Sequence, residues 1–569
     1  MEWISLQPDP EVVSHLGKQF KCSNIIATIL ANRGFTSLKE AQPFFNPSLD
    51  QLHDPFLMKD MDIAVDRVIK NIQTKTPIMV FGDYDVDGTS GASVLYLGMQ
   101  TVGGKPEFYI PNREIEGYGL SKKGIDTAKN IGANLIITCD CGINAFEAVQ
   151  YAQSIGVDVI ITDHHTPDAT LPNAFAVLNP KRKDCAYPFK GLCGAGVAFK
   201  FISGIIKNRG KSFSEISDLI SLMTLGTAAD LVPIKDENRT LVHFGLNQMK
   251  SPSSIGLSKL LALAKLSNKV PSIGQLVFGV APRINAAGRL GDANRSVKLL
   301  TTDNEDIASD LARELDEENK RRREIQDAVF EDALLKVNAE IDLSTDKAIV
   351  VWGKDWHPGV VGIVASKLKE EFHRPAIVIS MKEHGLGTGS ARSIRGLNLY
   401  DALTKVKSTL EGYGGHPMAA GLTVKEENCD SFRSSFVSIA NECLSDDDLI
   451  PGITVEGELK LNDITPRFMD FLDKLSPFGP GNMRPKFFAS NVEISGIPKV
   501  IGGGNHIRFT VRQNGTTYGA IGFNLSEHYQ DLITGNPIDL AFVVEINEWQ
   551  NRREIQLNVR DIKLTPNAH

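Results

Sequence analysis

Three aspartates occupy alternate positions directly after a short apolar run, in the segment IMVFGDYDVDGTSG at residues 78–91. They are Asp83, Asp85 and Asp87. Carboxylates this close repel one another, and keeping several of them ionised at one strand end costs free energy unless cations or strong donors offset the repulsion. The spacing therefore predicts a metal site. Taken alone, the segment could also be a solvated acidic turn.

The pattern D-x-D-x-D-G also opens the calcium loop of an EF-hand. Two features argue against that interpretation. The twelfth position of such a loop needs a bidentate glutamate, and here it is Val94. The residues IMVF before Asp83 are typical of a buried strand, whereas an EF-hand loop follows a helix.

Two further apolar segments end in polar residues of the same kind. NLIITCDCG reaches Asp140, and VDVIITDHHTP reaches Asp163, His164 and His165, with the helical segment FEAVQYAQSIG between them. This β-α-β alternation predicts a parallel sheet, and in such sheets ligands bind beyond the carboxyl ends of the strands. Asp230, at the end of the apolar helical segment LISLMTLGTAA, joins the candidate site only because the other clusters exist.

Together these acids and imidazoles form an oxygen-rich ligand set. Such a set suits Mn²⁺ or Mg²⁺ better than a metal that prefers thiolates. Two such ions about 3.5–4 Å apart would form a hydrolytic centre that activates water and stabilises charge on a phosphoryl group. The expected reaction is phosphoester hydrolysis.

The composition is that of an ordinary globular protein, with 569 residues, 42% hydrophobic and 23% charged, enough for three or four domains. A net charge of -8 does not favour a nucleic-acid binder, although local patches decide binding. No signal sequence, no run of 18 apolar residues and no C-x-x-C pair is visible. We expect a cytoplasmic protein with no membrane association, and we interpret Cys139 and Cys141 as buried thiols rather than zinc ligands.

Changes in residue patterning predict the domain organisation. Residues 1–50 form a helical lead-in that is expected to pack on the first domain, an α/β unit over residues 51–302 that holds the candidate site. Residues 303–340 are a charged connector helix, expected to be solvated and ion-paired, whose Lys320–Arg323 run could also contact phosphates.

Residues 341–445 form a second, smaller α/β unit. Its segments WHPGVVGIVASKL, GTGSARSIRG and GYGGHPMAAG have the composition of loops that let backbone N–H groups and arginines approach an anion. Residues 446–569, with short alternating strands such as ITVEGELKL and HIRFTVRQ, predict a small barrel of the OB-fold type. Barrels of this class often bind nucleic acid, which is the interpretation favoured here over a structural β-domain without a ligand.

The motifs GDYDVDG, TCDCG, TDHH and GTAADLVP, in that order, resemble the four motifs of the DHH phosphoesterase superfamily, and GYGGHPMAAG resembles the motif of its companion DHHA1 domain. APRINAAGR, HPGVVGIVASKL, GSARSIRG and the C-terminal β-domain resemble the RecJ family of single-strand-specific 5′→3′ DNA exonucleases. The resemblance spans nearly the whole chain. It implies a parallel-sheet DHH domain joined by a long helix to a DHHA1 domain, plus an OB-like barrel. It also implies two Mn²⁺ or Mg²⁺ ions, a role in DNA repair and recombination, and single-stranded DNA, a single-strand-binding protein and a helicase as partners.

The resemblance also implies a metal-ligand set. One ion would be held by Asp87, Asp140, His164 and Asp230, and the other by Asp85 and Asp140, so that Asp140 bridges the two; Asp83 would be a further ligand. Many relatives have a histidine four residues before the equivalent of Asp85. This chain has Phe81 there, so the second ion is expected to be held more weakly.

The remaining site residues implied by the resemblance act on the substrate. His165 would contact the scissile phosphate and help the leaving group depart. Three residues would bind the 5′-terminal phosphate, a task that suits the planar guanidinium group: Arg113, Ser390 and Arg392. Three more would be substrate contacts: Arg283, Asn285 and His416.

Two other functions stay open on these motifs. The same superfamily contains pyrophosphatases and small oligonucleotide or cyclic-dinucleotide phosphodiesterases, so the metal motifs alone do not choose the substrate. The extra β-domain and the long connector favour a nuclease, because a nuclease needs an extended groove. A non-catalytic DNA-binding scaffold would lack ligands, whereas this chain keeps every acid and both histidines.

Overall fold

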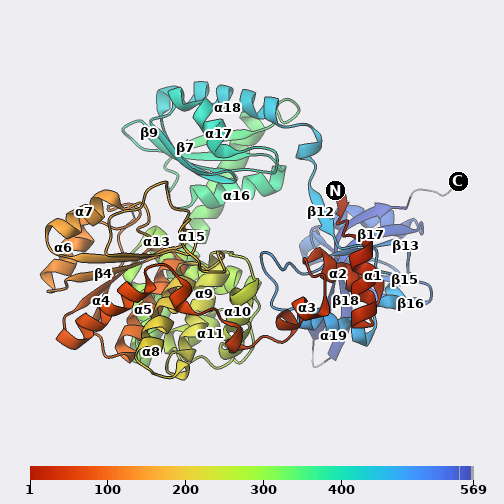
Figure 1. The fold of residues 1–569 in the computed structure, drawn as a ribbon. Helices are drawn as coiled ribbons and strands as arrows, with labels where there is room; N and C mark the ends of the chain where they lie inside the picture. The colour runs from red at the N-terminus through yellow and green to blue at the C-terminus, as the bar shows by residue number, and fades with distance from the viewer. Residues whose placement is uncertain (114, 550–551, 566–569) are drawn as a thin grey trace.

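The computed structural model describes residues 1–113, 115–549 and 552–565, and it shows three lobes (Figure 1). The first lobe carries helices α4 to α13, the second lies above it in the view, and the third lies to one side together with the N-terminal helices. None of the described helices combines the length and the apolar character that a membrane crossing requires.

A five-stranded parallel sheet forms the centre of the first lobe, in the order β3-β2-β4-β5-β6. The strands are β2 (Ile78–Gly82), β3 (Pro106–Tyr109), β4 (Leu135–Cys139), β5 (Asp158–Thr162) and β6 (Ala176–Leu178). Strands β2 and β4 are buried along their whole length, which explains why they are apolar without alternation. The predicted parallel sheet is confirmed.

The helices of the first lobe surround this sheet. They are α4 (Met61–Thr74), α5 (Val86–Thr101), α6 (Lys122–Asn130), α7 (Phe146–Ser154), α8 (Gly194–Asn208), α9 (Ile220–Ala229), α10 (Asp236–Gln248), α11 (Ile255–Leu263), α12 (Ile273–Gln275), α13 (Ala281–Leu290) and α14 (Asn294–Thr301). The helix after the aspartates, α5, begins at Val86, because the Asp85 carboxylate accepts a hydrogen bond from the Gly88 N–H (2.9 Å) and caps it. Asp87 therefore lies within the first turn of α5.

The connector is a single helix, α15 (Glu305–Glu340), that runs from the first lobe into the second. Its first half packs Leu311 and Leu315 into the core of the first lobe, and its second half packs Val329 and Val337 into the second. The expectation of a solvated connector is therefore wrong for one face of the helix, which is buried at both ends.

The second lobe has a mixed sheet in the order β10-β11-β9-β8-β7, in which only the described pair β7–β8 is parallel. Its elements are β7 (Ile349–Lys354), α16 (Val361–Phe372), β8 (Ala376–Met381), β9 (Leu386–Arg392), α17 (Leu399–Lys405), β10 (Gly412–His416), β11 (Ala419–Lys425) and α18 (Cys429–Cys443).

Two of the three segments expected to be anion-binding loops are strands instead. GTGSARSIRG contributes to β9, and GYGGHPMAAG forms the β10–β11 hairpin. Packing accounts for glycine in β9, since a Cβ on Gly389 would lie 2.9 Å from side-chain atoms of Ile379 and Leu422. In WHPGVVGIVASKL, by contrast, Gly359 precedes the helix α16 and Gly362 lies in its first turn.

The third lobe is a six-stranded sheet in the order β13-β17-β18-β16-β15-β14, and an additional β13–β15 pairing closes it into a barrel. The elements are α19 (Pro466–Leu475), β13 (Phe487–Ile494), β14 (Lys499–Ile501), β15 (His506–Gln513), β16 (Thr516–Gly522), α20 (Tyr529–Ile533), β17 (Ile538–Trp549) and β18 (Arg552–Leu564). ITVEGELKL was expected to be a barrel strand. Its strand, β12 (Gly452–Val455), instead pairs with β1 (Glu2–Ser5) in a separate two-stranded sheet.

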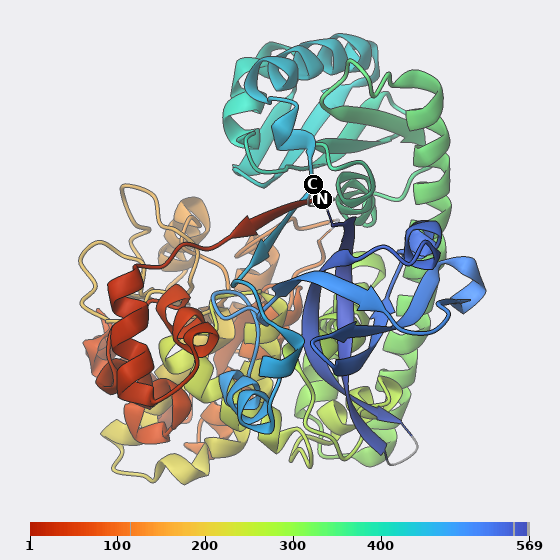
Figure 2. The same cartoon turned by 90° about the vertical axis from the view of Figure 1, so that its right-hand side faces the viewer.

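The N-terminal helices pack mainly on the third lobe, and their expected packing on the first domain is limited to the segment around Phe44, whose carbonyl accepts a hydrogen bond from Arg239 of α10 (3.0 Å). These helices are α1 (Pro10–Phe20), α2 (Asn24–Asn32) and α3 (Leu38–Phe45), and Figures 1 and 2 show them beside the barrel. Leu16 and Leu30 share a buried cluster with Phe468 and Leu472 of α19. An ion pair between Arg33 and Glu456 (3.0 Å) adds a polar link.

Candidate metal centre

The acids lie where the strands of the first lobe end. Asp83 follows β2 and Asp140 follows β4, and the register pairs Gly82 with Cys139, so the two ends are neighbours. Asp83, Asp85 and Asp140 can bring one oxygen each within 4.8 Å of one another. The structure therefore gathers the three acids that were expected around one ion.

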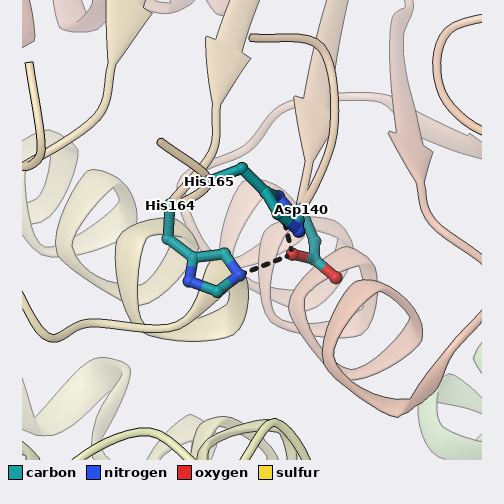
Figure 3. Close-up of side chains that lie close together, drawn as sticks. All are labelled: Asp140, His164 and His165. Carbon is teal, nitrogen blue, oxygen red and sulfur yellow. Dashed lines mark ion pairs between the residues drawn. The ribbon is translucent and has the colours of Figure 1, made fainter. Parts of the chain in front are cut away.

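A second group forms around His164. Its Nε2 atom lies 3.1 Å from an oxygen of Asp140, 3.6 Å from Asp230 and 3.8 Å from Asp87. Figure 3 shows the His164 and His165 rings, both directed at the Asp140 carboxylate. Asp140 lies close to both groups, so its position is compatible with the expected bridging role, which stays a prediction.

The N-terminus of α8 completes this second group, and the sequence motifs did not reveal it. The Asp87 carboxylate accepts hydrogen bonds from the N–H groups of Gly194 (2.6 Å) and Ala195 (2.9 Å). A Cβ on Gly194 would lie 2.5 Å from the Cβ of Asp140, so only glycine lets the helix approach this closely. The segment CGAGVAFK is an ordinary apolar helix in sequence, and only its position beside the acids gives it this role.

The acids are under electrostatic strain. Burial, with the charges of the neighbouring aspartates, raises the pKa of Asp140 and of Asp83 well above the usual range for aspartate. Burial, with the charges of Asp87 and Asp85, raises the pKa of Asp230 to about 8. Such shifts mean that adding positive charge here would be favourable.

Buried polar atoms without hydrogen-bond partners also indicate a site for cations. Among the described residues, one oxygen each of Asp83, Asp140 and Asp230 and both ring nitrogens of His164 are buried without a hydrogen-bond partner. Carboxylate oxygens with an imidazole nitrogen are ligands that Mn²⁺ and Mg²⁺ accept. The donor set therefore fits one or two divalent ions of this kind.

His165 differs from His164 in its partner. Its Nδ1 lies 2.8 Å from Asp163, whose other oxygen accepts the Ile143 N–H (3.0 Å). Burial alone would lower the pKa of His165, but the hydrogen bond and charge of Asp163 outweigh it and raise the pKa. Burial alone would raise the pKa of Asp163, and the contacts with His165 and the backbone lower it. His165 is thus oriented by Asp163, which is not one of the expected metal ligands.

Phe81 does not face the acids. Its buried ring stacks on Tyr109, with ring centres 5.6 Å apart, in the apolar layer on the other side of the sheet. The histidine that the resemblance leads us to expect at this position therefore has no polar replacement here.

The residues expected at the 5′-phosphate come from both lobes. Arg392 donates to the Ser390 hydroxyl (2.9 Å) on β9 of the second lobe. Arg113, in the loop after β3, lies with its guanidinium over the Tyr84 ring at 5.3 Å. The two lobes meet here, because Arg289 of α13 donates to the Gly359 carbonyl at 2.9 Å.

Arg289 and Arg322 extend this group. Arg322 belongs to the Lys320–Arg323 run that was considered a possible phosphate contact, whereas Arg289 was not singled out from the sequence. Burial, with the charges of Arg113, Arg322 and Arg392, lowers the pKa of Arg289 to about 10. The Nε atom of Arg322, on α15, is buried with no hydrogen-bond partner in the described chain. Four guanidinium groups near one another make a site for a polyanion. Hereafter Arg113, Arg289, Arg322 and Arg392, with Ser390, are called the arginine pocket.

The other expected substrate contacts are placed differently. Arg283 is held by Asp316 (2.8 Å) and by the carbonyls of Gly279 and Leu263, so its guanidinium braces α13 against α15. Asn285 lies on the same helix, one turn before Arg289, and is half-buried. His416, at the end of β10, lines a cavity of about 410 Å³ with His165.

Comparisons with known proteins agree with this geometry. Family models match as the DHH family N-terminal domain over residues 77–227, the DHHA1 domain over 345–442 and the RecJ OB domain over 455–561. The chain is 38% identical over 564 residues to the single-stranded-DNA-specific exonuclease RecJ of Bacillus subtilis, covering 99% of this chain and 70% of that protein. It is 33% identical over 559 residues to the protein of that name from Escherichia coli, covering 95% of each.

A solved structure is similar over the full length. The crystal structure of RecJ in complex with Mn²⁺ from Thermus thermophilus matches with a TM-score of 0.84 at 27% identity, covering 100% of this chain and 80% of that one. A complex of the same protein with Mg²⁺ matches with a TM-score of 0.78.

Proposed function

The chain belongs to the RecJ family of single-stranded-DNA-specific exonucleases, and we propose that it removes nucleotides from the 5′ end of single-stranded DNA with two Mn²⁺ or Mg²⁺ ions. The observation that carries the polarity is the arginine pocket at the junction of the lobes, beside the metal centre. A terminal phosphate has one more ionisable oxygen than an internal one, so a pocket of guanidinium groups favours a strand end. Binding the end there would place the next phosphodiester at the acids.

Each group of residues has a proposed task. Asp87, Asp140, His164 and Asp230 hold one ion, and Asp83, Asp85 and Asp140 hold the other. The ions, when bound, lower the pKa of a water molecule and offset the charge that develops on the phosphate. His165, oriented by Asp163, is placed to donate a proton to the leaving oxygen, since its raised pKa keeps it protonated nearer to neutral pH.

The third lobe is proposed to hold the strand away from the cut. A barrel of this class binds single strands along a groove. A single-strand-binding protein and a helicase are proposed as partners, and DNA repair and recombination as the setting, because these processes produce the single strands that the enzyme would degrade. A cytoplasmic location is part of the proposal, supported by seven cysteines that are all free thiols.

A panel of substrates tests this proposal against the phosphodiesterase alternative. The full chain with Mn²⁺ should degrade a long single strand and leave the matching duplex intact, and chelation of the ions should stop the reaction. The proposal fails if a dinucleotide or pyrophosphate is hydrolysed efficiently while the long single strand is not.

A further inference from the structure

The loop after β3 carries two residues that face different parts of the site. Arg113 belongs to the arginine pocket, and Tyr118, five positions later, reaches the metal centre. The loop is anchored by Glu116, whose carboxylate accepts hydrogen bonds from the hydroxyls of Tyr109 (2.9 Å) and Ser121 (2.7 Å). Glu116 therefore fixes the part of this loop on which Tyr118 lies.

Tyr118 contacts both residues on which the proposed reaction depends most. Its hydroxyl donates to the backbone carbonyl of Asp140 at 3.1 Å and lies 3.5 Å from Nδ1 of His165. Asp140 has a φ of 60°, in the left-handed region that residues other than glycine adopt only as single residues. The tyrosine thus holds the carbonyl of this aspartate in an uncommon backbone conformation.

Ring contacts join Arg113 to Tyr118 through Tyr84. The Arg113 guanidinium lies over Tyr84, and the Tyr118 ring meets Tyr84 edge-on with centres 6.5 Å apart. Tyr118 also meets the His165 ring edge-on at 6.1 Å. Tyr84 itself stands between Asp83 and Asp85 in the chain. The series therefore runs from the arginine pocket, past the acids, to His165.

We propose that Tyr118 is a positioning residue that couples occupancy of the arginine pocket to the placement of Asp140 and His165. A bound 5′-phosphate fixes Arg113, and through the Tyr84 ring it fixes Tyr118. The tyrosine then holds the Asp140 carbonyl and the His165 ring in the reactive arrangement. The enzyme would thereby cut fastest when a true 5′-phosphate end is seated. This inference rests on the proposed function.

The test compares Tyr118→Phe with the unmodified enzyme on single strands that carry either a 5′-phosphate or a 5′-hydroxyl. The variant keeps the ring and loses the hydroxyl. On phosphorylated strands we expect kcat to fall about 10-fold with little change in KM. Loss of one positioning hydrogen bond changes the arrangement of the reacting groups and leaves the affinity for the strand nearly unchanged. On hydroxyl strands the fall should be smaller, so the preference for the phosphate shrinks.

Two further variants give the test its controls. Tyr151→Phe removes a hydroxyl bond to Asp126 on the surface of the same lobe (2.6 Å) and should leave kcat unchanged. Arg113→Ala combined with Tyr118→Phe should lose less than the product of the two single losses, because both changes interrupt one coupling. Binding of Mn²⁺ alone and of a phosphorylated strand in EDTA should stay within about twofold for Tyr118→Phe, which separates positioning from ligand loss.

The outcomes are distinct. Absence of degradation by the unmodified enzyme would contradict the proposed function. Degradation by the unmodified enzyme, with Tyr118→Phe keeping both kcat and the phosphate preference, would contradict the coupling alone. Fully multiplicative losses in the double variant would also overturn it.

Discussion

At the scale of single residues, His164 and His165 are neighbours in sequence with different surroundings. His164 faces three carboxylates, whereas His165 is held by Asp163. His165→Ala should lower turnover about 10²–10⁴-fold, the range for loss of a general acid, with little change in the Mn²⁺ concentration needed for half-activity. His384→Ala, on an exposed turn of the second lobe, is the control. A large loss of Mn²⁺ affinity in His165→Ala would instead make this histidine a ligand.

The raised pKa of Asp230 predicts how the metal-free protein responds to pH. Between about pH 4, the ordinary pKa of aspartate, and about pH 8, the folded chain holds a proton on Asp230 that the unfolded chain has lost. The native state then binds more protons, so stability falls as pH rises through this window.

Thermal unfolding in EDTA measures this effect. The melting temperature should decrease from pH 5 to pH 8, and Asp230→Asn should decrease less, because its amide does not titrate. Adding Mn²⁺ should raise the melting temperature of the unmodified protein more at pH 8 than at pH 5. An equal pH dependence for the two proteins would show that Asp230 is not strained by its neighbours.

At the scale of elements, the strand ends of the first lobe could be predicted because they depend on local sequence. An apolar run followed by Asp83 or Asp140 specifies a buried strand and a polar end without knowledge of the partner strands. The glycine-rich segments of the second lobe could not, since pairing across the sheet overrides the low strand propensity of Gly389 and Gly421. Arg322 could not be singled out within the Lys320–Arg323 run, because tertiary packing decides which arginine of a charged helix is buried.

The arginine pocket draws on the loop after β3, the end of α13, the middle of α15 and the end of β9, and β9 gives its simplest test. Arg392→Ala should cost about 1.5–3 kcal/mol of charge-assisted hydrogen bonding on strands with a 5′-phosphate. Strands with a 5′-hydroxyl should be bound and cut nearly as before. Arg313→Ala, an exposed arginine of α15 paired with Asp310, is the matched control. Equal losses on the two kinds of end would place the terminal phosphate elsewhere.

At the scale of the whole molecule, the N-terminal helices belong with the barrel. Sequence could not show this, because the residues that meet, such as Leu16 and Phe468, are more than 400 positions apart and the apolar face of a helix does not specify its partner. Arg239 of α10 joins this unit to the first lobe by donating to the carbonyls of Phe44, Lys474 and Ser476 (2.8–3.0 Å).

This arrangement changes how the barrel should be removed. Cutting only at residue 451 would expose the apolar faces of α1 and α2, so residues 1–46 must be removed together with 451–569. The remaining chain should still cleave very short oligomers but bind long strands more weakly. The binding constant should also depend less steeply on salt. Each lost phosphate contact removes about 0.7 from the slope of the logarithm of the binding constant against the logarithm of the salt concentration for a single strand. An unchanged slope would mean that the barrel does not carry the strand.

The most direct measurement of the central claim follows the two ends of one strand. A single-stranded DNA labelled at the 5′ end, and the same strand labelled at the 3′ end, are digested with Mn²⁺ by the full chain, by Asp140→Ala and by Asp168→Ala, an exposed loop acid used as control. The full chain and Asp168→Ala should release 5′-labelled mononucleotide from the first time point, while the 3′-labelled strand shortens progressively. Asp140→Ala should release nothing and remain folded. Release of the 3′ label first, or near-normal turnover by Asp140→Ala, would contradict the account.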